Sequence, residues 1–532
     1  MPNRVRLPDN PDDLKALLSR QWAEVAALKE AHHALLEEAA VLKIERDALR
    51  AQKQDDKQEI QRLTLLLAKL QRALYGHKSE KLIGQIEQLE LELEELHINQ
   101  GERAQKVETT APVAAPRPAP QRRPLPEHLP RETRERLPAE PDCPDCGGAW
   151  QRLGEDVSEV LEHVPASLRV IRYVRPRFSC TCCDRMAQAP AVGRPIARSY
   201  AGPGLLSRIM TAKYLDHQPL YRQSQIYARE GVELPETTMG DWVGGVHELL
   251  RPLVDALRGH VFGAAKLHTD DTPINVLSPG NGKTRQARLW VYARDDRPHG
   301  DTTAPAVWFR YSPDRKGIHP QTHLKDYSGI LQADAFAGYN ALYESGRVIE
   351  AACWAHARRK VYDIHVHRPS AITTHVLERI AQLYHIESGI RGSPPEVRRA
   401  VRQEQAKPIV AALHAWLTDQ LPTLSRKSET AAAIGYTVNQ WRALTRYLDD
   451  GRIEMDNNVA ERALRGVALG RKNFLFLGSD AGGARAATLY SLLGTAKLNG
   501  INPEAYLTHV LSVIADHPVN RVDELLPWNV TI

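Results

Sequence analysis

The alternation of apolar and polar residues between positions 263 and 356 constrains the fold of this chain most strongly. The runs AAKLHTDD, ARLWVYARD and AVWFRYS alternate as strands do, and the PGNG turn at 279–282 joins the first two, which predicts an antiparallel three-stranded meander. GILQAD at 329–334 predicts a fourth strand, a helix-like segment follows, and IEAACWAH at 349–356 predicts a fifth strand. Residues 360–450 are mostly helical, and another helix begins near Asn457.

This order of elements is typical of a ribonuclease-H-like core. The long stretch between the fourth strand and the helix near Asn457 needs structure of its own, because unstructured loops beyond about 15 residues are uncommon. We therefore expect a multidomain α/β protein. Its catalytic core comprises residues 261–359 and 451–500, a helical insertion at 360–450 interrupts that core, and a C-terminal segment at 501–532 follows it.

Three acidic residues fall where such a core would bring them together. Asp270 ends the first expected strand, Asp334 ends the fourth, and Glu461 lies on the helix after the insertion. Carboxylate oxygens suit Mg²⁺ or Mn²⁺ rather than zinc. Two such ions about 4 Å apart can activate water or a 3′-hydroxyl on one side of a phosphate and stabilise the leaving oxygen on the other. The pattern predicts that these three acids bind two divalent ions and carry catalysis.

Neighbouring residues leave alternatives open at this site. Glu454 and Asp456 are rivals for the third acidic position. Asp271 points to the opposite side of the strand if the pleat continues, so it is either a helper or a solvent-facing residue. His356 assists proton transfer or simply packs, and we assign it no catalytic role.

Five of the six cysteines lie between positions 143 and 183, which favours metal binding in a reducing compartment. Cys143-x2-Cys146 and Cys180-x2-Cys183 form two turns, and each turn can present two thiolates to one tetrahedral ion. Four thiolates close the coordination shell, so the spacing predicts a structural Zn²⁺ in a module at 142–195. Reduced, buried thiols are the alternative, and the spare Cys182 leaves the ligand register open.

Leucines recur every seven residues near the N-terminus, as at Leu28, Leu35, Leu42 and Leu49. This spacing predicts a leucine-zipper-like coiled coil within residues 1–100 that joins subunits into at least a dimer. The alternative is one long amphipathic helix packed on its own domain. Residues 101–141 are rich in Pro and Arg, which predicts an extended basic linker.

Residues 196–260 suggest short helices with a turn at Gly231, a helix-turn-helix shape that predicts a DNA-binding region but is shared by generic helical pairs. Basic side chains near the acids are expected to hold the DNA backbone. They are Arg358, Arg359, Lys360, Arg462, Arg465, Arg471 and Lys472. For the first three, a solvated helix start is the alternative.

The formal net charge of +5 permits nucleic-acid binding without demanding it. No apolar run approaches the ~18 residues of a membrane-spanning helix, and the N-terminus lacks the apolar core of a signal peptide. We therefore expect a soluble protein of the cytosol without a membrane partner.

The longer motifs resemble those of the IS66 family of insertion-sequence transposases along essentially the whole chain. They include LQRALYGHKSEKL (70–82), the CPDCGG and CTCC pair, HTDDTPINVL (268–277), LQADAFAGYNALY (331–343), AACWAHARRK (351–360) and DNNVAERALRGVALGRKNFLFLGSDAGG (456–483). The first family motif usually reads Asp-Glu-Thr-Pro, and Asp271 replaces its second acid here.

The resemblance implies a DDE-type transposase with a ribonuclease-H fold and a catalytic triad at Asp270, Asp334 and Glu461. It also implies metal-dependent cleavage at the element's terminal inverted repeats, strand transfer of the 3′-OH into target DNA, and small accessory proteins of the same element. Two other functions compete with this one. The chain could be a zinc-containing DNA-binding regulator with a non-catalytic α/β domain, or a ribonuclease-H-like nuclease for RNA or junction DNA.

Overall fold

The computed structural model describes residues 193–197, 199–278, 280 and 283–531, positions 168, 170 and 171, and two short strands. These strands, β1 (Arg177–Ser179) and β2 (Met186–Gln188), pair in antiparallel register. The chain forms two compact units. The larger one contains Gly193–Gln225 and the residues from Leu234 onward, and it holds the central sheet.

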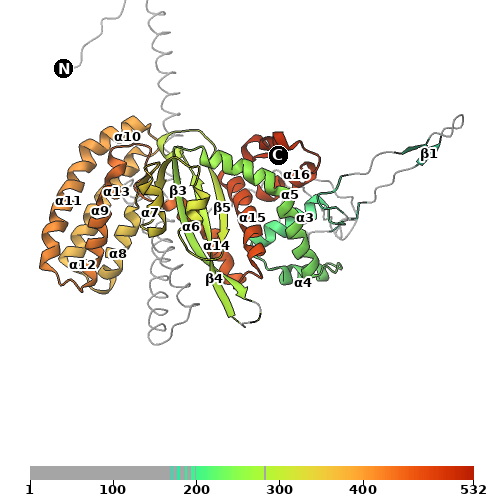
Figure 1. Cartoon of the computed structure of the whole chain (residues 1–532), viewed down its shortest axis with the longest axis horizontal. Coiled ribbons are helices and arrows are strands. Elements are labelled where there is room, and N and C mark those ends of the chain that lie inside the picture. The colour runs from blue at the N-terminus through green and yellow to red at the C-terminus, as the bar shows by residue number, and fades with distance from the viewer. Residues whose placement is uncertain are drawn as a thin grey trace, which may run out of the picture. The chain divides into compact units, whose positions relative to one another are not determined.

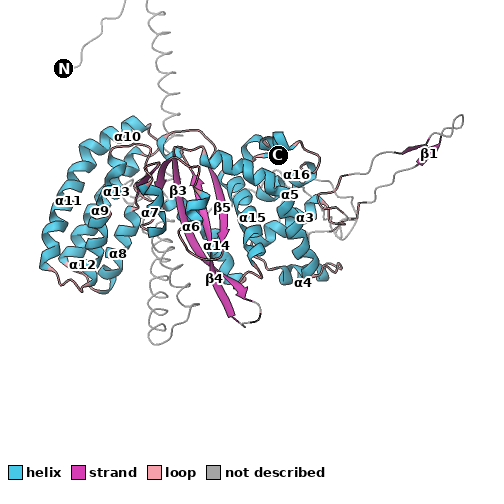
Figure 2. Cartoon of the chain, viewed as in Figure 1, coloured by secondary structure: helices cyan, strands magenta, loops and turns pink. Residues whose placement is uncertain are grey.

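A five-stranded mixed sheet lies within the larger unit (Figures 1 and 2), with its strands in the order β5-β4-β3-β6-β7. β3, β4 and β5 are antiparallel neighbours, in agreement with the meander expected from the sequence. β6 runs parallel to β3, and β7 runs parallel to β6. The bounds are β3 (Lys266–Ser278), β4 (Lys283–Arg294), β5 (Ala306–Ser312), β6 (Gly329–Gln332) and β7 (Val348–Ala351).

The first strand is longer than the sequence suggested. We expected it to end at Asp270, but β3 continues to Ser278 because β4 pairs with it over that whole length. The parallel pairing of β3 with β6 stops earlier, where His268 lies opposite Gln332. Asp270 therefore lies in the middle of β3, two residues past the end of the parallel ladder.

The fifth strand is shorter than expected and does not reach residue 356. It ends at Ala351, and Cys353 is the N-cap residue of helix α8 (Trp354–His367). The CWAHARRK segment is therefore the start of a helix rather than the end of a strand. As a result, α8 crosses the expected boundary between the core and the insertion at 359–360.

Helix α15 (Asp480–Leu498) covers the edge of the sheet at β5. The hydroxyl of Ser491 accepts a hydrogen bond from the backbone N–H of Phe309 at 2.8 Å, and the hydroxyl of Thr495 bonds both the N–H and the carbonyl of Val307. An uncovered edge strand would leave such groups open to pairing with another chain. Close approach is possible because Gly494 lacks a Cβ, which would lie 3.1 Å from Val307.

Most residues between 196 and 260 belong to the same unit as the sheet, but Ile226–Glu233 belong to the smaller unit. The helix, turn and second helix expected there are α4 (Leu220–Arg229), a turn with Gly231 at φ +83°, and α5 (Glu236–Phe262), preceded by α3 (Pro203–Tyr214). α5 is much longer than a recognition helix requires. One of its faces is buried, and the helix contacts β5 and α15.

The helical insertion packs on the β7 side of the sheet (Figure 1). Its helices share an apolar core that includes Ile380, Leu413 and Leu444 and is continuous with Ile330 of β6. The fully buried Trp354 at the start of α8 donates from its ring nitrogen to the Leu444 carbonyl at 2.9 Å. The insertion elements are α9 (Ala371–Ile390), α10 (Pro395–Val401), the π-helical turn η3 (Arg402–Ala406), α11 (Lys407–Gln420), η4 (Leu421–Thr423), α12 (Glu429–Asn439), α13 (Trp441–Thr445) and η5 (Arg446–Leu448).

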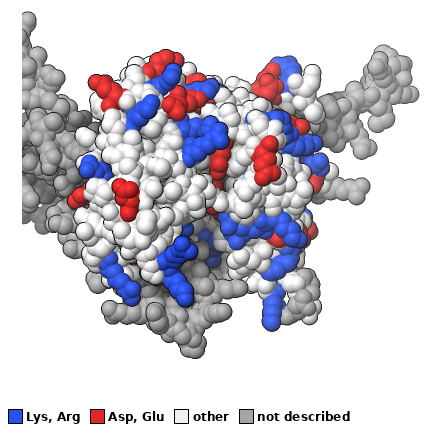
Figure 3. Space-filling view, turned by 60° about the vertical axis from the view of Figure 1, so that its left-hand side comes forward, with Lys and Arg blue, Asp and Glu red and all other residues white. Residues whose placement is uncertain are grey.

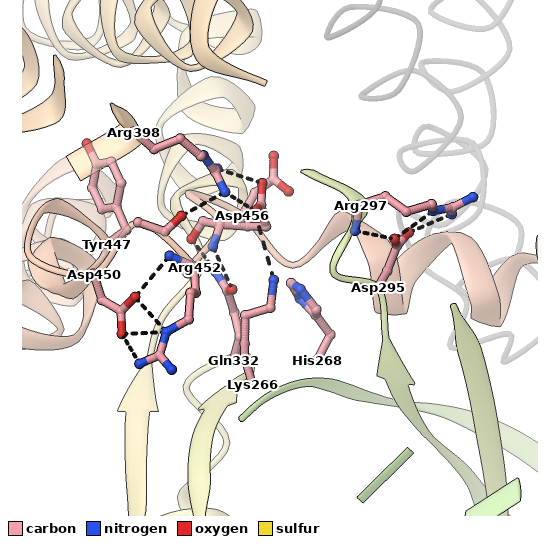
Figure 4. Close-up of polar contacts among 12 residues, drawn as sticks. Lys266, His268, Asp295, Arg297, Gln332, Arg398, Tyr447, Asp450, Arg452 and Asp456 are labelled. Atoms are coloured by element: carbon pink, nitrogen blue, oxygen red, sulfur yellow. Dashed lines mark hydrogen bonds and ion pairs between the residues drawn. The ribbon is translucent and has the colours of Figure 1, made fainter. Parts of the chain in front are cut away.

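A series of buried ion pairs joins the insertion to β3, and two of its members, Arg398 and Lys266, are labelled in Figure 4. Arg402 binds both carboxylate oxygens of Glu387 at 2.7 Å. Arg398 binds Glu387 at 3.3 Å and Glu454 at 2.8 Å, and Glu454 lies 3.9 Å from the ammonium group of Lys266 on β3. Positive and negative side chains alternate along this series of ion pairs, so each buried ion lies next to an ion of opposite charge.

The remaining elements connect the strands or close the C-terminal part. No helix in the described ranges is long and apolar enough to cross a membrane. The other bounds are η1 (Arg297–His299), α6 (Ile318–His323), η2 (Ala337–Tyr339), α7 (Asn340–Glu344), α14 (Asn458–Asn473), α16 (Pro503–Val513), η6 (Val519–Leu525) and η7 (Pro527–Asn529).

The close approach of the insertion to the loop before α14 gives a stability prediction. A Cβ at Gly451 would collide with the backbone of Pro395, whereas a Cβ at Gly466 inside α14 would meet no atom within 4 Å. We expect Gly451→Ala to lower the free energy of unfolding by about 1–3 kcal/mol. Gly466→Ala, the matched control, should raise it by up to about 1 kcal/mol. Thermal unfolding monitored by circular dichroism measures both, and equal melting temperatures for the two variants would contradict the prediction.

Candidate active site

Three of the acids selected from the sequence lie on or just after elements that are neighbours in the folded chain, because β3 pairs with β6 and packs against α14. Asp270 comes from β3, Asp334 follows β6 by two residues, and Glu461 lies in the first turn of α14. Burial raises the pKa of Asp270 well above its usual range, and the negative charges of Asp334 and Glu461 raise it further. The charges of Asp334 and Glu461 therefore act on the same buried carboxylate, although the three acids come from separate elements.

Asp271 is held by arginines and does not face solvent. Its side chain is 1% exposed, accepts a hydrogen bond from Arg288 at 3.1 Å and another from Arg315 at 2.9 Å. Arg315 also lies 3.4 Å from a carboxylate oxygen of Asp334. Burial raises the pKa of Asp271, while these two arginines act in the opposite direction. The solvent-facing alternative for Asp271 is therefore wrong, and Arg315 links it to the acid cluster.

Glu461 lies beside His356 of α8 and beside Cys353, the N-cap residue of that helix. The Nδ1 atom of His356 is 3.6 Å from Oε1 of Glu461, and neither buried atom has a hydrogen-bond partner among the described residues. The Sγ atom of Cys353, a nitrogen of His356 and a carboxylate oxygen of Glu461 all lie within 4.8 Å of one another, close enough to share a metal ion. Burial raises the pKa of the Cys353 thiol well above its ordinary value.

The two rivals for the third acidic position have other partners. Glu454 is buried in the ion-pair chain, and Lys266 and Arg398 hold its pKa at about 2 in spite of its burial. Asp456 accepts hydrogen bonds from the backbone and side chain of Asn458. Burial raises the pKa of Asp456 to about 6. Among Glu454, Asp456 and Glu461, it is Glu461 whose charge is a main influence on the pKa of Asp270.

Asn457 and His268 lie directly behind the acids. Asn457 is fully buried, its side-chain amide donates to the carbonyl of Thr269 at 2.9 Å, and its side-chain oxygen lies 3.0 Å from Nδ1 of His268. We expected Asn457 at the start of a capped helix, and it is the N-cap residue of α14. Its side chain makes no cap hydrogen bond, however, and is turned toward β3 instead.

The basic residues expected to contact DNA lie on two helices, α8 and α14. Arg358 stacks over Tyr362, and Lys360 lies 4.6 Å from the ring centre of Tyr436. The guanidinium group of Arg471 donates a hydrogen bond to the carbonyl of Pro273 at 2.7 Å. This bond connects α14 to β3. The other four are Arg359, Arg462, Arg465 and Lys472, of which Arg462 and Lys472 are exposed. Clusters of Lys and Arg side chains are visible on one face of the molecule (Figure 3).

Several expected sites lie outside the described residues. They include the coiled coil, the Pro/Arg-rich linker and the four cysteines assigned to zinc, Cys143, Cys146, Cys180 and Cys183.

Sequence reasoning missed three residues of this site. Arg315 lies in the loop after β5, where no periodic pattern marks it. His268 is one of several residues on the first expected strand, and no motif sets it apart. Cys353 lies far along the chain from the other five cysteines. The C-x2-H spacing from Cys353 to His356 was the one signal that could have drawn attention to it.

The chain belongs to the IS66 family of transposases. The sequence model described as "Transposase IS66 family" matches residues 198–485, more than half of the chain. The model described as "IS66 C-terminal element" matches residues 491–528. That described as "zinc-finger binding domain of transposase IS66" matches 140–184, and that described as "Transposase C of IS166 homeodomain" matches 62–134. This membership supports DNA as the partner of the chain.

Relatives of similar length occur in Sinorhizobium fredii. The uncharacterized protein y4hP is 40% identical over 490 residues, which cover 88% of each chain. The uncharacterized protein y4qI is 38% identical over 540 residues, which cover 98% of this chain and 97% of that one. The likeness to y4qI therefore extends over nearly the whole sequence.

The buried His268 gives a prediction on pH and stability. Burial, followed by the charge of Lys266, lowers the pKa of His268 from 6.5 to about 3 in the folded chain. The unfolded chain therefore takes up a proton as the pH falls through 6.5, while the folded chain stays neutral, so stability is lost as the pH falls from 6.5 toward 3. Between pH 7.5 and 5.5 this loss amounts to about 1.4 kcal/mol.

His268→Asn removes the titrating group, so its stability should fall less over the same pH range. Chemical unfolding of both proteins at pH 7.5 and pH 5.5 measures the difference. An identical loss in the variant would show that His268 does not cause the pH dependence.

Proposed function

We propose that the chain is a DDE-type DNA transposase with a ribonuclease-H-like catalytic core, in which Asp270, Asp334 and Glu461 form the triad. The observation that carries the proposal is the placement of the three acids: β3, which holds Asp270, pairs with β6 two residues before Asp334, and α14, which holds Glu461, packs against β3. Crowding of like charges raises the free energy of the folded chain unless cations bind among them. The strand order β5-β4-β3-β6-β7, antiparallel on one side and parallel on the other, supports the assignment of the core.

The residues fit a pair of Mg²⁺ or Mn²⁺ ions. All three donors are carboxylates, the ligands that these hard cations prefer. Oε1 of Glu461 is buried and makes no hydrogen bond to any residue that the structure describes, which supports its use as a ligand. Bound divalent ions would supply stabilisation of the negative charge on the phosphate and on the attacking and leaving oxygens.

The surrounding residues of the chain would orient these ligands and the DNA. Arg315 neutralises Asp271 and contacts Asp334 from one side. His356 lies beside Glu461 and limits the positions that its carboxylate adopts. The DNA backbone would be held by the basic side chains of α8 and α14, namely Arg358, Arg359, Lys360, Arg462, Arg465, Arg471 and Lys472.

The proposed reaction consists of two phosphoryl transfers. Water attacks the phosphodiester at the end of a terminal inverted repeat, and the leaving 3′-oxygen takes a proton to become a 3′-hydroxyl. That hydroxyl then attacks a phosphodiester of target DNA, which forms one new bond and releases one strand end. No covalent enzyme intermediate is required.

The regions outside the catalytic core would join the subunits to one another and to DNA. We propose that Cys143, Cys146, Cys180 and Cys183 hold a structural Zn²⁺, and the zinc-finger match at 140–184 supports this because it spans all four. The region before residue 100 would pair subunits as a coiled coil, and residues 196–260 would contribute to DNA binding. Accessory proteins of the same element are further candidate partners. The proposed site of action is the bacterial cytosol.

The triad gives the central prediction. Asp334→Asn should lower the rate of Mg²⁺-dependent cleavage of an element-end duplex by about 10³-fold, because loss of a metal ligand removes several kcal/mol of transition-state stabilisation. Binding of the same duplex, measured by gel shift, should change less than about threefold, because phosphate contacts with the basic side chains remain.

Asp326→Asn is the matched control, since Asp326 is an exposed aspartate whose ion-pair partner, Arg258, lies 3.8 Å away and outside the acid cluster. It should cleave as the unchanged protein does. Labelled products resolve nicked, excised and joined strands. Unimpaired strand transfer by Asp334→Asn would refute the triad. Specific binding without any cleavage by the unchanged protein would favour a DNA-binding regulator, and cleavage of hybrids or branched substrates without joining would favour a nuclease.

The zinc assignment has its own test. Purified protein should contain one zinc per chain, and Cys183→Ser should lose most of it because three thiolates leave the tetrahedral shell open. Cys182→Ser should retain the metal. Elemental analysis of both variants measures the content. Loss from Cys182→Ser and retention in Cys183→Ser would reverse the ligand register.

A further inference from the structure

Asn457 connects β3 and α14, which carry two of the three acids, with the N-terminus of α8. Its side-chain amide donates to the carbonyl of Thr269 on β3 at 2.9 Å. Its backbone N–H donates to Sγ of Cys353, the N-cap residue of α8, at 3.2 Å. Its own carbonyl accepts the backbone N–H of Glu461 in the first turn of α14, at 3.4 Å.

Each of these contacts is next to a residue of the candidate metal site. Thr269 immediately precedes Asp270, and Cys353 starts the helix that carries His356. Mg²⁺ requires near-ideal octahedral geometry with ligands about 2.1 Å away. Small shifts between β3 and α14 would therefore change the ability of Asp270 and Glu461 to share ions.

We propose that Asn457 is a positioning residue that sets the geometry of the divalent-ion site, and that His268 fixes the orientation of its amide. This inference rests on the proposed function of the acids and names residues behind them that carry no metal themselves. Asn457 touches neither DNA nor ion in the proposal, and it acts through the placement of Asp270 and Glu461.

The hydrogen-bond chemistry defines the role of His268. The Thr269 carbonyl can only accept, so the NH₂ group of Asn457 faces it and the amide oxygen faces His268. Nδ1 of His268 must then be the donor. Its other ring nitrogen, Nε2, is buried without a hydrogen-bond partner in the part of the chain that the structure describes. The bond to Asn457 is therefore the hydrogen bond that the ring of this buried histidine makes.

A direct measurement of ion binding tests the inference without relying on turnover. Mn²⁺ is titrated into the full-length protein, and the free ion is followed by electron paramagnetic resonance. Loss of a residue that orients metal ligands typically weakens metal affinity about 10–100-fold. We expect Asn457→Ala to weaken Mn²⁺ binding within that range.

Asn458→Ala is the matched control in the same helical turn. Its side chain bonds to Asp456 and does not reach β3, so Mn²⁺ affinity should change less than about threefold. Thermal unfolding of both variants shows whether they are folded under the conditions of the titration.

A second pair of variants keeps the test valid if Asn457→Ala does not fold. His268→Asn places an amide N–H near the position of Nδ1, whereas His268→Leu fills the space without a donor. The inference predicts weaker Mn²⁺ binding for His268→Leu and substantial recovery for His268→Asn. Equal affinity in both would refute the orienting role of His268.

Asp334→Asn separates failure of this inference from failure of the proposed function. If Asp334→Asn weakens Mn²⁺ binding but Asn457→Ala binds as the unchanged protein does, Asn457 is not a positioning residue. If Asp334→Asn leaves Mn²⁺ binding unchanged, the acids do not form the metal site and the proposed function fails with it.

Discussion

The buried carboxylate of Asp270, on which the charges of Asp334 and Glu461 both act, is the constraint around which this core is organised. Burial already disfavours a charged Asp270, and two further carboxylates nearby increase that cost. The folded state can tolerate this unfavourable electrostatic energy only if other contacts hold β3, β6 and α14 together. The sheet does so for β3 and β6 through their parallel pairing, and the contacts of α14 with β3 and β4 hold Glu461 in place.

Positive charge is distributed unevenly around these acids. Arg288 and Arg315 bind Asp271, and Arg315 reaches Asp334 at 3.4 Å. No arginine or lysine is among the leading influences on Asp270 in the described part of the chain, where His356 is the group that lowers its pKa. A divalent ion would add positive charge beside Asp270, where burial and the neighbouring acids disfavour the charged carboxylate.

The insertion is tied to the core by charge as well as by apolar packing. Isolated buried ions are costly, and removal of one partner from a buried pair leaves the other uncompensated. The alternating series Arg402, Glu387, Arg398, Glu454 and Lys266 avoids this cost and ends on β3, four residues before Asp270. The helices of the insertion and the strand of the central acid are thereby held in one relative position.

From the sequence alone, the strand meander, the helices of residues 360–450 and the family could be predicted, while the roles of Asp270, Asp334 and Glu461 are a proposal. Alternation of apolar and polar residues and long motifs are properties of contiguous sequence. They can therefore be recognised without knowledge of tertiary contacts. Tertiary structure decided the rest. β3 extends past Asp270 because β4 pairs with it, and the fifth strand stops early because Cys353 begins a helix. The partners Arg315, His268 and Asn457 converge from distant positions, and no periodicity in the chain records which side chains meet across such distances.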